Sequence, residues 1–473
     1  MKSSGAEWLG DVPEHWDVQP LGRIGSFFKG RGGTKDDEVE EGVPCVRYGD
    51  LYMRHRFFIN ESRARIAPQV AKAKYTPIRY GDILFAGSGE TLAEIGKSAV
   101  NLIRGSAYCG GDVIICRPSI DANARFLAYA ADCPASVHQK ACFGRGLTVM
   151  HIYSRDLKHM AVAIPPRPEQ AAIVRFLDHV NRRIQRYIRG KERLIELLDE
   201  QKHAIIHQAV TGQIDVRTRR PYPTYRESGV EWLGEVPKQW EVRRLRNVGK
   251  AITGLTYAPQ DVGDGEDGVL VLRASNISEG QIVDADNVFV RCSIPSQLIT
   301  RTGDILICSR SGSKTLIGKS ARIDSTSSGV TFGAFMTIFR CANNDYLYCV
   351  FNSRLFEYPS VAFLTSTINK LTICMLYGIK IPFPPHAEQQ QIIQYLARAT
   401  RILNEAITRS RRQIELLREY RIRLIADVVT GKLDVREAAA VLPDVDSLAI
   451  GRTRGTTPES GAAPEAFVEH ARR

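Results

Sequence analysis

The chain of 473 residues contains a long internal repeat, and this repeat constrains its fold more than any other feature. The string EWLGDVPEHWDV starts at position 7 and EWLGEVPKQWEV at position 231, and eight of their twelve positions are identical. GDIL occurs at positions 81 and 303, IGKSA at 95 and 317, and TGQIDVR at 211 answers TGKLDVR at 430. Two related halves predict two similar structural units in a pseudo-twofold arrangement.

The spacing between equivalent positions shows which parts of the repeat tolerate insertions. The offset is 224 at the opening motif, 226 at Arg47 and Arg273, and 222 at the GDIL strings, but it stays at 219 from position 165 to position 217. Loops tolerate changes in length, whereas one residue inserted into a long paired helix rotates its face by about 100°. The segment of constant offset therefore predicts a long paired helix in each half.

The spacing of large side chains in these segments supports that prediction, because it alternates between four and three residues as in a heptad seam. The two sets are Ile173, Leu177, Val180, Ile184, Tyr187, Lys191, Leu194, Leu198, Gln201 and Ile205, and Ile392, Leu396, Ala399, Leu403, Ala406, Ser410, Gln413, Leu417, Tyr420 and Leu424. Pro-Pro pairs precede both segments, and Gly212 and Gly431 end them. We predict two helices that pair with each other; the alternative is two separate helices, each packed on its own domain.

The remaining segments predict mixed domains. Short apolar runs such as 112–116 and 303–308 alternate with Gly-, Asp- and Asn-rich turns, and helices are expected near 125–132 and 345–352. We expect an α+β chain with a mixed α/β domain at 1–165, a helix at 166–212, a linker at 213–238, a second mixed α/β domain at 239–385, a helix at 386–431 and a disordered tail at 437–473.

Charge and cysteine content narrow the class of protein. The formal net charge of +12 favours a polyanionic partner, although a generally basic protein is the alternative. The ten cysteines show no metal-ligand spacing, so we expect no metal site and a reducing compartment. We find no apolar run of membrane-spanning length and no signal-peptide pattern, and we expect a cytoplasmic protein without a cofactor.

Two strings resemble catalytic loops but lack their companions. Residues 85–89 fit the F-x-G-x-G loop of adenine methyltransferases, yet the counterpart at 307–311 has lost this pattern and no Asn/Asp/Ser-Pro-Pro-aromatic string is present. Gly96-Lys97-Ser98 follows Gly89 by six intervening residues, whereas a phosphate-binding loop requires four. We therefore expect no catalytic residue in this chain.

The order of the repeated motifs resembles the specificity subunits of type I restriction–modification systems. The resemblance is carried by the two Glu-Trp-Leu-Gly-x-Val-Pro-x-x-Trp openings, the Arg-x-x-[Asp/Asn]-[Leu/Ile] strings at 47–51 and 273–277, the Gly-Asp-Ile-Leu strings, and the Pro-Pro-x-x-Glu-Gln strings before the helices. It covers about residues 5–436.

This resemblance implies that each mixed domain is a target recognition domain that reads one half of a split, asymmetric site in double-stranded DNA. It implies that the two helices pair antiparallel as a spacer. It also implies two modification subunits as partners, which supply adenine-N6 methyltransferase activity, and restriction subunits that add ATP-dependent endonuclease activity. The chain itself is expected to be non-catalytic.

Basic and Gly-rich loops predict where DNA binds, because cationic side chains contact phosphates and arginine pairs with guanine. In the first domain we expect contacts from Lys29, Arg31, Lys35, Arg54, Arg56, Arg145 and Thr148. In the second domain we expect them from Thr256, Tyr257, Arg310, Lys314, Asn369 and Lys370. For each cluster, the alternative is a solvated loop. Arg47 and Arg273 recur in both halves, which favours a shared structural or phosphate-binding role.

Two other function classes stay open. In the first, the chain is a DNA-modifying enzyme: a methyltransferase, fused or stand-alone, or a nuclease. In the second, it is a coiled-coil scaffold without a nucleic-acid ligand. The missing Pro-Pro-aromatic string and the lack of clustered carboxylates weigh against an enzyme. The net charge of +12 and the unequal halves weigh against a scaffold.

Overall fold

The computed structural model describes residues 1–146, 149–263, 265–342, 344–356 and 370–443. It divides into two compact units. The first unit comprises Met1–Arg189 together with the chain from Ile414 onward, and the second comprises Gly190–Gln413. The first unit is therefore built from segments that lie far apart in the sequence.

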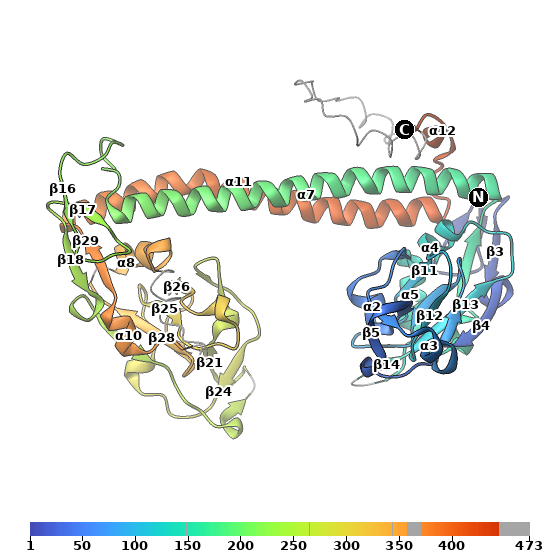
Figure 1. Cartoon of the computed structure of the whole chain (residues 1–473), viewed down its shortest axis with the longest axis horizontal. Coiled ribbons are helices and arrows are strands. Elements are labelled where there is room, and N and C mark those ends of the chain that lie inside the picture. The colour runs from blue at the N-terminus through green and yellow to red at the C-terminus, as the bar shows by residue number, and fades with distance from the viewer. Residues whose placement is uncertain (147–148, 264, 343, 357–369, 444–473) are drawn as a thin grey trace. The chain divides into compact units, whose positions relative to one another are not determined.

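Two long helices, α7 (Arg167–Thr211) and α11 (His386–Val429), lie side by side (Figure 1). Both begin directly after a Pro-Pro pair, which blocks helix formation further upstream. A glycine with a φ of 75° follows each helix, Gly212 after α7 and Gly431 after α11. This left-handed conformation favours glycine and stops the helix.

Shared cores show how the helices pair. In the first unit, Ile173 near the start of α7 lies in one core with Val428 near the end of α11. In the second unit, Val210 near the end of α7 shares a core with Ile392 near the start of α11. The helices are therefore antiparallel, as expected.

The heptad register predicted from the sequence holds over part of each helix, where Ile173 and Ile392 are buried, and is wrong over the rest. Tyr187, Leu194 and Tyr420 were expected on the seam, but their side chains are 57%, 38% and 54% exposed. Ile188 and Arg421 are buried instead. A straight α-helix repeats every 3.6 residues, so its buried stripe drifts by about 20° per heptad from a strict 3.5-residue pattern. The drift moves the stripe by one residue.

Each opening motif of the repeat packs on the helix end of the other half. Pro13 and Trp16 cover the glycine that follows α11, where a Cβ atom would lie 2.3 Å from Cδ of Pro13. Pro237 and Trp240 cover the glycine that follows α7, and a Cβ atom there would lie 2.4 Å from Cδ of Pro237. Both tryptophans are fully buried, so these residues anchor the core of each unit.

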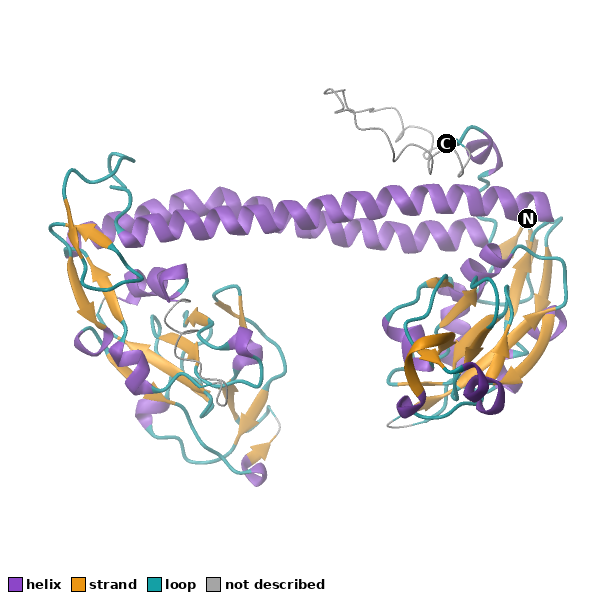
Figure 2. Cartoon of the chain, in the orientation of Figure 1, coloured by secondary structure: helices purple, strands orange, loops and turns teal. Residues whose placement is uncertain are grey.

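The first unit contains two main sheets (Figure 2), and apolar side chains between them form a core. One sheet has the order β4 (Gly25–Lys29), β13 (Val113–Pro118), β9 (Ile83–Ala86), β11 (Ser98–Asn101) and β6 (Phe57–Ile59). The other has the order β7 (Arg65–Ile66), β5 (Glu38–Val46), β12 (Ala107–Cys109) and β8 (Thr76–Ile78).

Shorter elements complete the first unit. The paired strands are β1 (Lys2–Ser3) with β2 (Asp11–Val12), β3 (Asp17–Pro20) with β15 (Ala161–Ile164), and β10 (Ser88–Gly89) with β14 (Met150–His151). The helices are α1 (Leu21–Ile24), α2 (Tyr48–Met53), α3 (Pro68–Lys74), α4 (Ala124–Asp132), α5 (Pro134–Phe143), α6 (Ser154–Leu157) and the 3-10 turn η1 (Lys35–Asp37).

The second unit repeats this plan with two four-stranded sheets. One has the order β19 (Lys250–Thr253), β28 (Met336–Arg340), β25 (Ile305–Cys308) and β26 (Ser320–Arg322). The other has the order β20 (Val262–Gly263), β24 (Val288–Val290), β21 (Val269–Leu272) and β27 (Thr331–Phe332). The α+β class and the mixed composition of both domains, expected from the sequence, are confirmed.

Shorter elements complete the second unit as well. The paired strands are β16 (Tyr225–Glu227) with β17 (Glu235–Pro237), β18 (Glu241–Arg244) with β29 (Lys380–Phe383), and β22 (Ile277–Ser278) with β23 (Gln281–Ile282). The helices are α8 (Asn344–Phe351) and α10 (Ile373–Gly378), with 3-10 turns η2 (Leu245–Asn247), η3 (Pro259–Asp261), η4 (Ala274–Asn276), η5 (Ser296–Leu298) and η6 (Lys314–Leu316).

Order extends further towards the C-terminus than the sequence predicts. Residues Arg436–Ala440 form α12, and Ala439 is buried in the first unit. The carbonyl oxygen of Leu442 accepts a hydrogen bond from Arg175 of α7. These contacts correct the expected start of the tail at 437, and the rest of it, 444–473, lies outside the described residues. Within the described ranges, every helix is too short or too polar to cross a bilayer.

Candidate nucleic-acid interface

The first predicted cluster surrounds the end of β4. Lys29 ends this strand, Arg31 follows in the loop and Lys35 begins η1, and all three side chains are exposed. The loop backbone runs close to its neighbour, because a Cβ atom at Gly30 would lie 2.3 Å from the carbonyl oxygen of Gly110. The fold thus fixes the path of the loop and leaves its three cations in solvent.

The second predicted cluster follows α2. Nε of Arg54 lies 3.4 Å from Oδ1 of Asp50, so part of its charge is neutralised. Arg56 lies over the ring of Phe57, with 5.4 Å from Cζ to the ring centroid, and has no carboxylate partner within ion-pair distance among the described residues. Burial lowers the pKa of Arg56. The positive charge of Arg56 is therefore less compensated than that of Arg54.

Arg421 of α11 adds a further cation to this cluster, and the sequence analysis missed it as a site residue. Its side chain is only 8% exposed, and its Nε has no hydrogen-bond partner among the described residues. Burial, together with the positive charges of Arg56 and Arg418, lowers the pKa of Arg421 to about 10. No sequence signal marked this position, because the predicted seam contained the neighbouring Tyr420 instead.

The third predicted cluster of the first unit is the loop after α5, which contains Arg145 and Thr148. Arg145 is 66% exposed, and its Nη2 lies 3.9 Å from a carboxylate oxygen of Asp156. Lys314 lies in η6 of the second unit. Thr148 and Asn369 lie outside the described residues.

A cavity of about 390 Å³ in the second unit brings three predicted residues together. Thr256, Arg310 and Lys370 all line it, whereas Tyr257 packs against a neighbouring apolar core. The guanidinium of Arg310 lies over the exposed ring of Phe335, with 4.9 Å from Cζ to the ring centroid. We call Arg310, Phe335 and Lys370 the second strand-end site, and it presents two cations beside an aromatic face.

A polar cluster in the first unit was also missed by the sequence analysis. The hydroxyl of Ser88 donates to Oδ2 of Asp112 at 3.2 Å and lies 3.1 Å from Nδ1 of His151. The carbonyl oxygen of Ser88 accepts a hydrogen bond from the Tyr52 hydroxyl at 2.6 Å. We call Ser88, Asp112 and His151 the first strand-end site. Its members lie far apart in the sequence, so no local motif revealed it.

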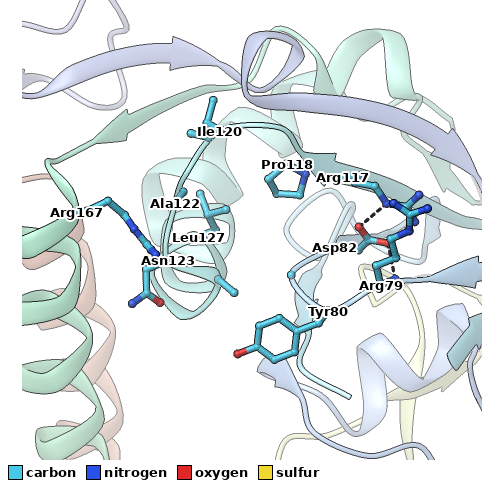
Figure 3. Close-up of a pocket in the computed structure, with 12 residues that line it drawn as sticks. Arg79, Tyr80, Asp82, Arg117, Pro118, Ile120, Ala122, Asn123, Leu127 and Arg167 are labelled. Atoms are coloured by element: carbon cyan, nitrogen blue, oxygen red, sulfur yellow. Dashed lines mark hydrogen bonds and ion pairs between the residues drawn. The ribbon is translucent and has the colours of Figure 1, made fainter. Parts of the chain in front are cut away.

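A second cavity, of about 480 Å³, lies in the first unit near the start of α7 (Figure 3). Two hydrogen bonds of 2.9 and 2.7 Å join Arg117 to Asp82, which is buried. Arg167 pairs with Asp121 at 3.2 Å, and Tyr80 also lines the cavity. Because carboxylates compensate two of the three arginines that line it, this cavity is a weaker candidate for a phosphate than the second strand-end site with its two cations.

Several motifs of the repeat support the fold. In the second unit, Arg340 binds Asp304 through bonds of 2.7 and 2.5 Å, which repeats the pair of the first unit and explains the aspartate of both GDIL strings. Arg47 and Arg273 each form an ion pair with a nearby carboxylate, at 2.9 and 3.2 Å. Nζ of Lys97, in the first IGKSA string, donates a hydrogen bond of 2.7 Å to the carbonyl oxygen of Tyr52 in α2.

Comparison with known proteins gives a consistent result. The chain is 23% identical over 442 residues to the type I restriction enzyme MjaVIII specificity subunit of Methanocaldococcus jannaschii, covering 90% of this chain and 94% of that one. It is 28% identical over 209 residues to the EcoKI specificity subunit of Escherichia coli K12, covering 42% of this chain and 44% of that one.

The fold also matches a solved structure of the type I restriction–modification system, described in terms of complex assembly and conformational transition. The TM-score is 0.64 at 18% identity, covering 89% of this chain and 100% of the other. The family model of the type I restriction modification DNA specificity domain matches twice, at residues 13–196 and 237–416. The chain therefore belongs to the family of type I restriction modification DNA specificity domains, which it carries in two copies.

Proposed function

We propose that each unit reads one half of a bipartite, asymmetric DNA sequence, so that the chain directs its complex to a target without catalysing the reaction. One observation carries this proposal: the two units share a strand plan, yet equivalent positions hold Ser88, Asp112 and His151 in one unit and Arg310, Phe335 and Lys370 in the other. Conserved architecture with different polar side chains suits two readers of different sequence.

The exposed cations of the first three clusters support backbone binding. Phosphate contacts position a protein on the duplex, and base contacts specify the sequence. The proposed contacts among the described residues are Lys29, Arg31, Lys35, Arg54, Arg56, Arg145, Thr256, Tyr257, Arg310, Lys314 and Lys370. We assign Thr148 and Asn369 to the same role from the sequence alone.

The two long helices support the proposed spacing role. A helix of 45 residues spans about 68 Å at 1.5 Å per residue, and an antiparallel pair resists changes in length. We further propose that the helices and recognition domains bind two modification subunits with adenine-N6 methyltransferase activity, that restriction subunits add ATP-dependent endonuclease activity, and that the complex works in the cytoplasm.

Selection from a randomised pool of duplex DNA tests this function. The chain in complex with its modification subunits should enrich two short sequences of different composition, separated by a gap of fixed length. The purified chain alone should transfer no methyl group from S-adenosylmethionine to the enriched DNA. Methylation by the chain alone, or enrichment of one continuous sequence, would contradict the proposal.

A further inference from the structure

Backbone hydrogen bonds show that the two strand-end sites occupy equivalent positions. In the first unit, the N–H of Gly87 donates to the carbonyl oxygen of Asp112 at 2.7 Å. In the second unit, the N–H of Ser309 donates to the carbonyl oxygen of Phe335 at 2.9 Å. Each bond lies just beyond an antiparallel pair of central strands, β9 with β13 and β25 with β28. Asp112 and Phe335 are therefore equivalent.

The next residue along each chain gives the same result. Ser88 pairs with His151 where β10 meets β14, and Arg310 forms an isolated antiparallel bridge with Lys370. Ser88 thus corresponds to Arg310 and His151 to Lys370. The same backbone framework carries a hydroxyl, a carboxylate and an imidazole in one unit, and a guanidinium, an aromatic ring and an ammonium group in the other.

The first strand-end site presents hydrogen-bond acceptors. The Ser88 hydroxyl has a single proton and donates it to Asp112. His151 must then donate from Nδ1 to the hydroxyl oxygen, which leaves Nε2 of the neutral imidazole as an acceptor. The carboxylate of Asp112 is also acceptor-only, and both Asp112 and His151 are exposed.

The arrangement of this cluster argues against a nucleophilic triad. In a triad, the imidazole lies between the hydroxyl and the carboxylate, so that the carboxylate orients the base. Here the hydroxyl of Ser88 lies between Asp112 and His151. Ser88 is also largely buried, at 7% exposure, so its hydroxyl positions the two exposed groups.

The second strand-end site presents donors only. A guanidinium carries five N–H donors in a fixed fork and an ammonium group carries three. Stacking on the ring of Phe335 orients the guanidinium of Arg310. This geometry suits a base edge with two neighbouring acceptors, which in the major groove is the N7 and O6 edge of guanine.

Building on the proposed DNA recognition, we propose that the two strand-end sites determine base preference with opposite chemistry. The first site accepts the N4 amino group of cytosine, and the second donates to N7 and O6 of guanine. Adenine suits the first site less well, because its N7 acceptor lies beside its amino group and faces the acceptors of Asp112 and His151.

Substitutions that keep the backbone intact test this inference. Asp112 has a φ of 59°, a left-handed conformation that asparagine also adopts readily, so Asp112→Asn preserves the turn while replacing one acceptor with a donor. Arg310→Met removes the donors and keeps an apolar stem over the ring. Exposed residues of the same units provide the matched controls Glu61→Gln and Arg246→Met.

The measurement is selection from randomised duplex DNA, performed with the full chain bound to its modification subunits, followed by titration of the wild-type target. Asp112→Asn should relax a cytosine preference at one position of the first half-site, and Arg310→Met should relax a guanine preference at one position of the second. Each should weaken binding to the wild-type target roughly 10- to 100-fold, whereas the controls leave it unchanged.

Three outcomes would overturn the inference. They are an unchanged base preference, a relaxed preference at bases other than cytosine and guanine, and a uniform loss of affinity for every sequence, which would indicate a phosphate contact. If the wild-type complex itself enriches no sequence, the proposed DNA recognition fails as well. Circular dichroism and thermal melting of each variant show whether it retains its fold.

Discussion

Arg421 illustrates how a single residue combines a cost in stability with a gain in charge. Its side chain is 8% exposed, and its Nε has no hydrogen-bond partner among the described residues. The nearby positive charge of Arg56 disfavours the charged form of Arg421. A buried cation without a carboxylate destabilises the folded state, because its lost hydration is not compensated. The folded state therefore bears this cost at neutral pH, below the lowered pKa of about 10.

Replacing Arg421 with methionine should separate these two effects. Arg421→Met should raise the free energy of unfolding by about 1–2 kcal/mol, because an apolar chain of similar length suits the buried seam. It should also weaken DNA binding and reduce the salt dependence of the binding constant by about one phosphate contact. Urea unfolding and binding titrations at several salt concentrations measure both.

The matched control for this substitution is Arg423→Met, since Arg423 is exposed and pairs with Glu419 on the same helix. Loss of an exposed pair changes stability by less than about 1 kcal/mol. Reduced stability of Arg421→Met with unchanged DNA binding would show that Arg421 supports the fold through its charge.

At the scale of elements, local signals in the sequence predicted the long helices well. Pro-Pro pairs and terminal glycines mark where α7 and α11 begin and end, because these residues act on their own backbone. The seam was harder to predict, because the difference between a 3.5- and a 3.6-residue repeat accumulates over many turns. Tyr187 was therefore assigned to the seam, although its neighbour Ile188 is the buried residue.

The strand-end sites were harder still to predict. Arg310 stood out because it lies in a basic loop, but Ser88, Asp112 and His151 form a cluster only after β10 pairs with β14 and the turn before β13 closes. Their separation in the sequence gives no periodic or spacing signal. Tertiary hydrogen bonds create this site, so only the structure revealed it.

Lengthening both helices tests the spacing role of α7 and α11. Seven residues inserted into each helix, near Gly190 and Arg409, preserve the buried stripe to within about 20°. The insertion adds about 10 Å, which corresponds to roughly three base pairs. Selection from randomised DNA should return the same two half-sites with a longer gap. An unchanged gap would show that another part of the complex sets the spacing.

At the scale of the whole molecule, the repeat forms a common framework with two different readers. The opening motif of each half packs on the helix end of the other, which explains why Trp16 and Trp240 and the glycines after both helices recur. Insertions and deletions fall instead in the segments that build the recognition sheets. Because each unit packs its sheet and its own anchor into a core of its own, each reader should be replaceable without the other.

Exchange of one reader tests this account most directly. Residues 20–160 of this chain are replaced with the equivalent segment of another family member, and the target of the reconstituted complex is determined by selection from randomised duplex DNA. The account predicts that one half-site changes, while the other half-site and the length of the gap stay the same. A change in both half-sites would contradict the assignment of one reader to each unit.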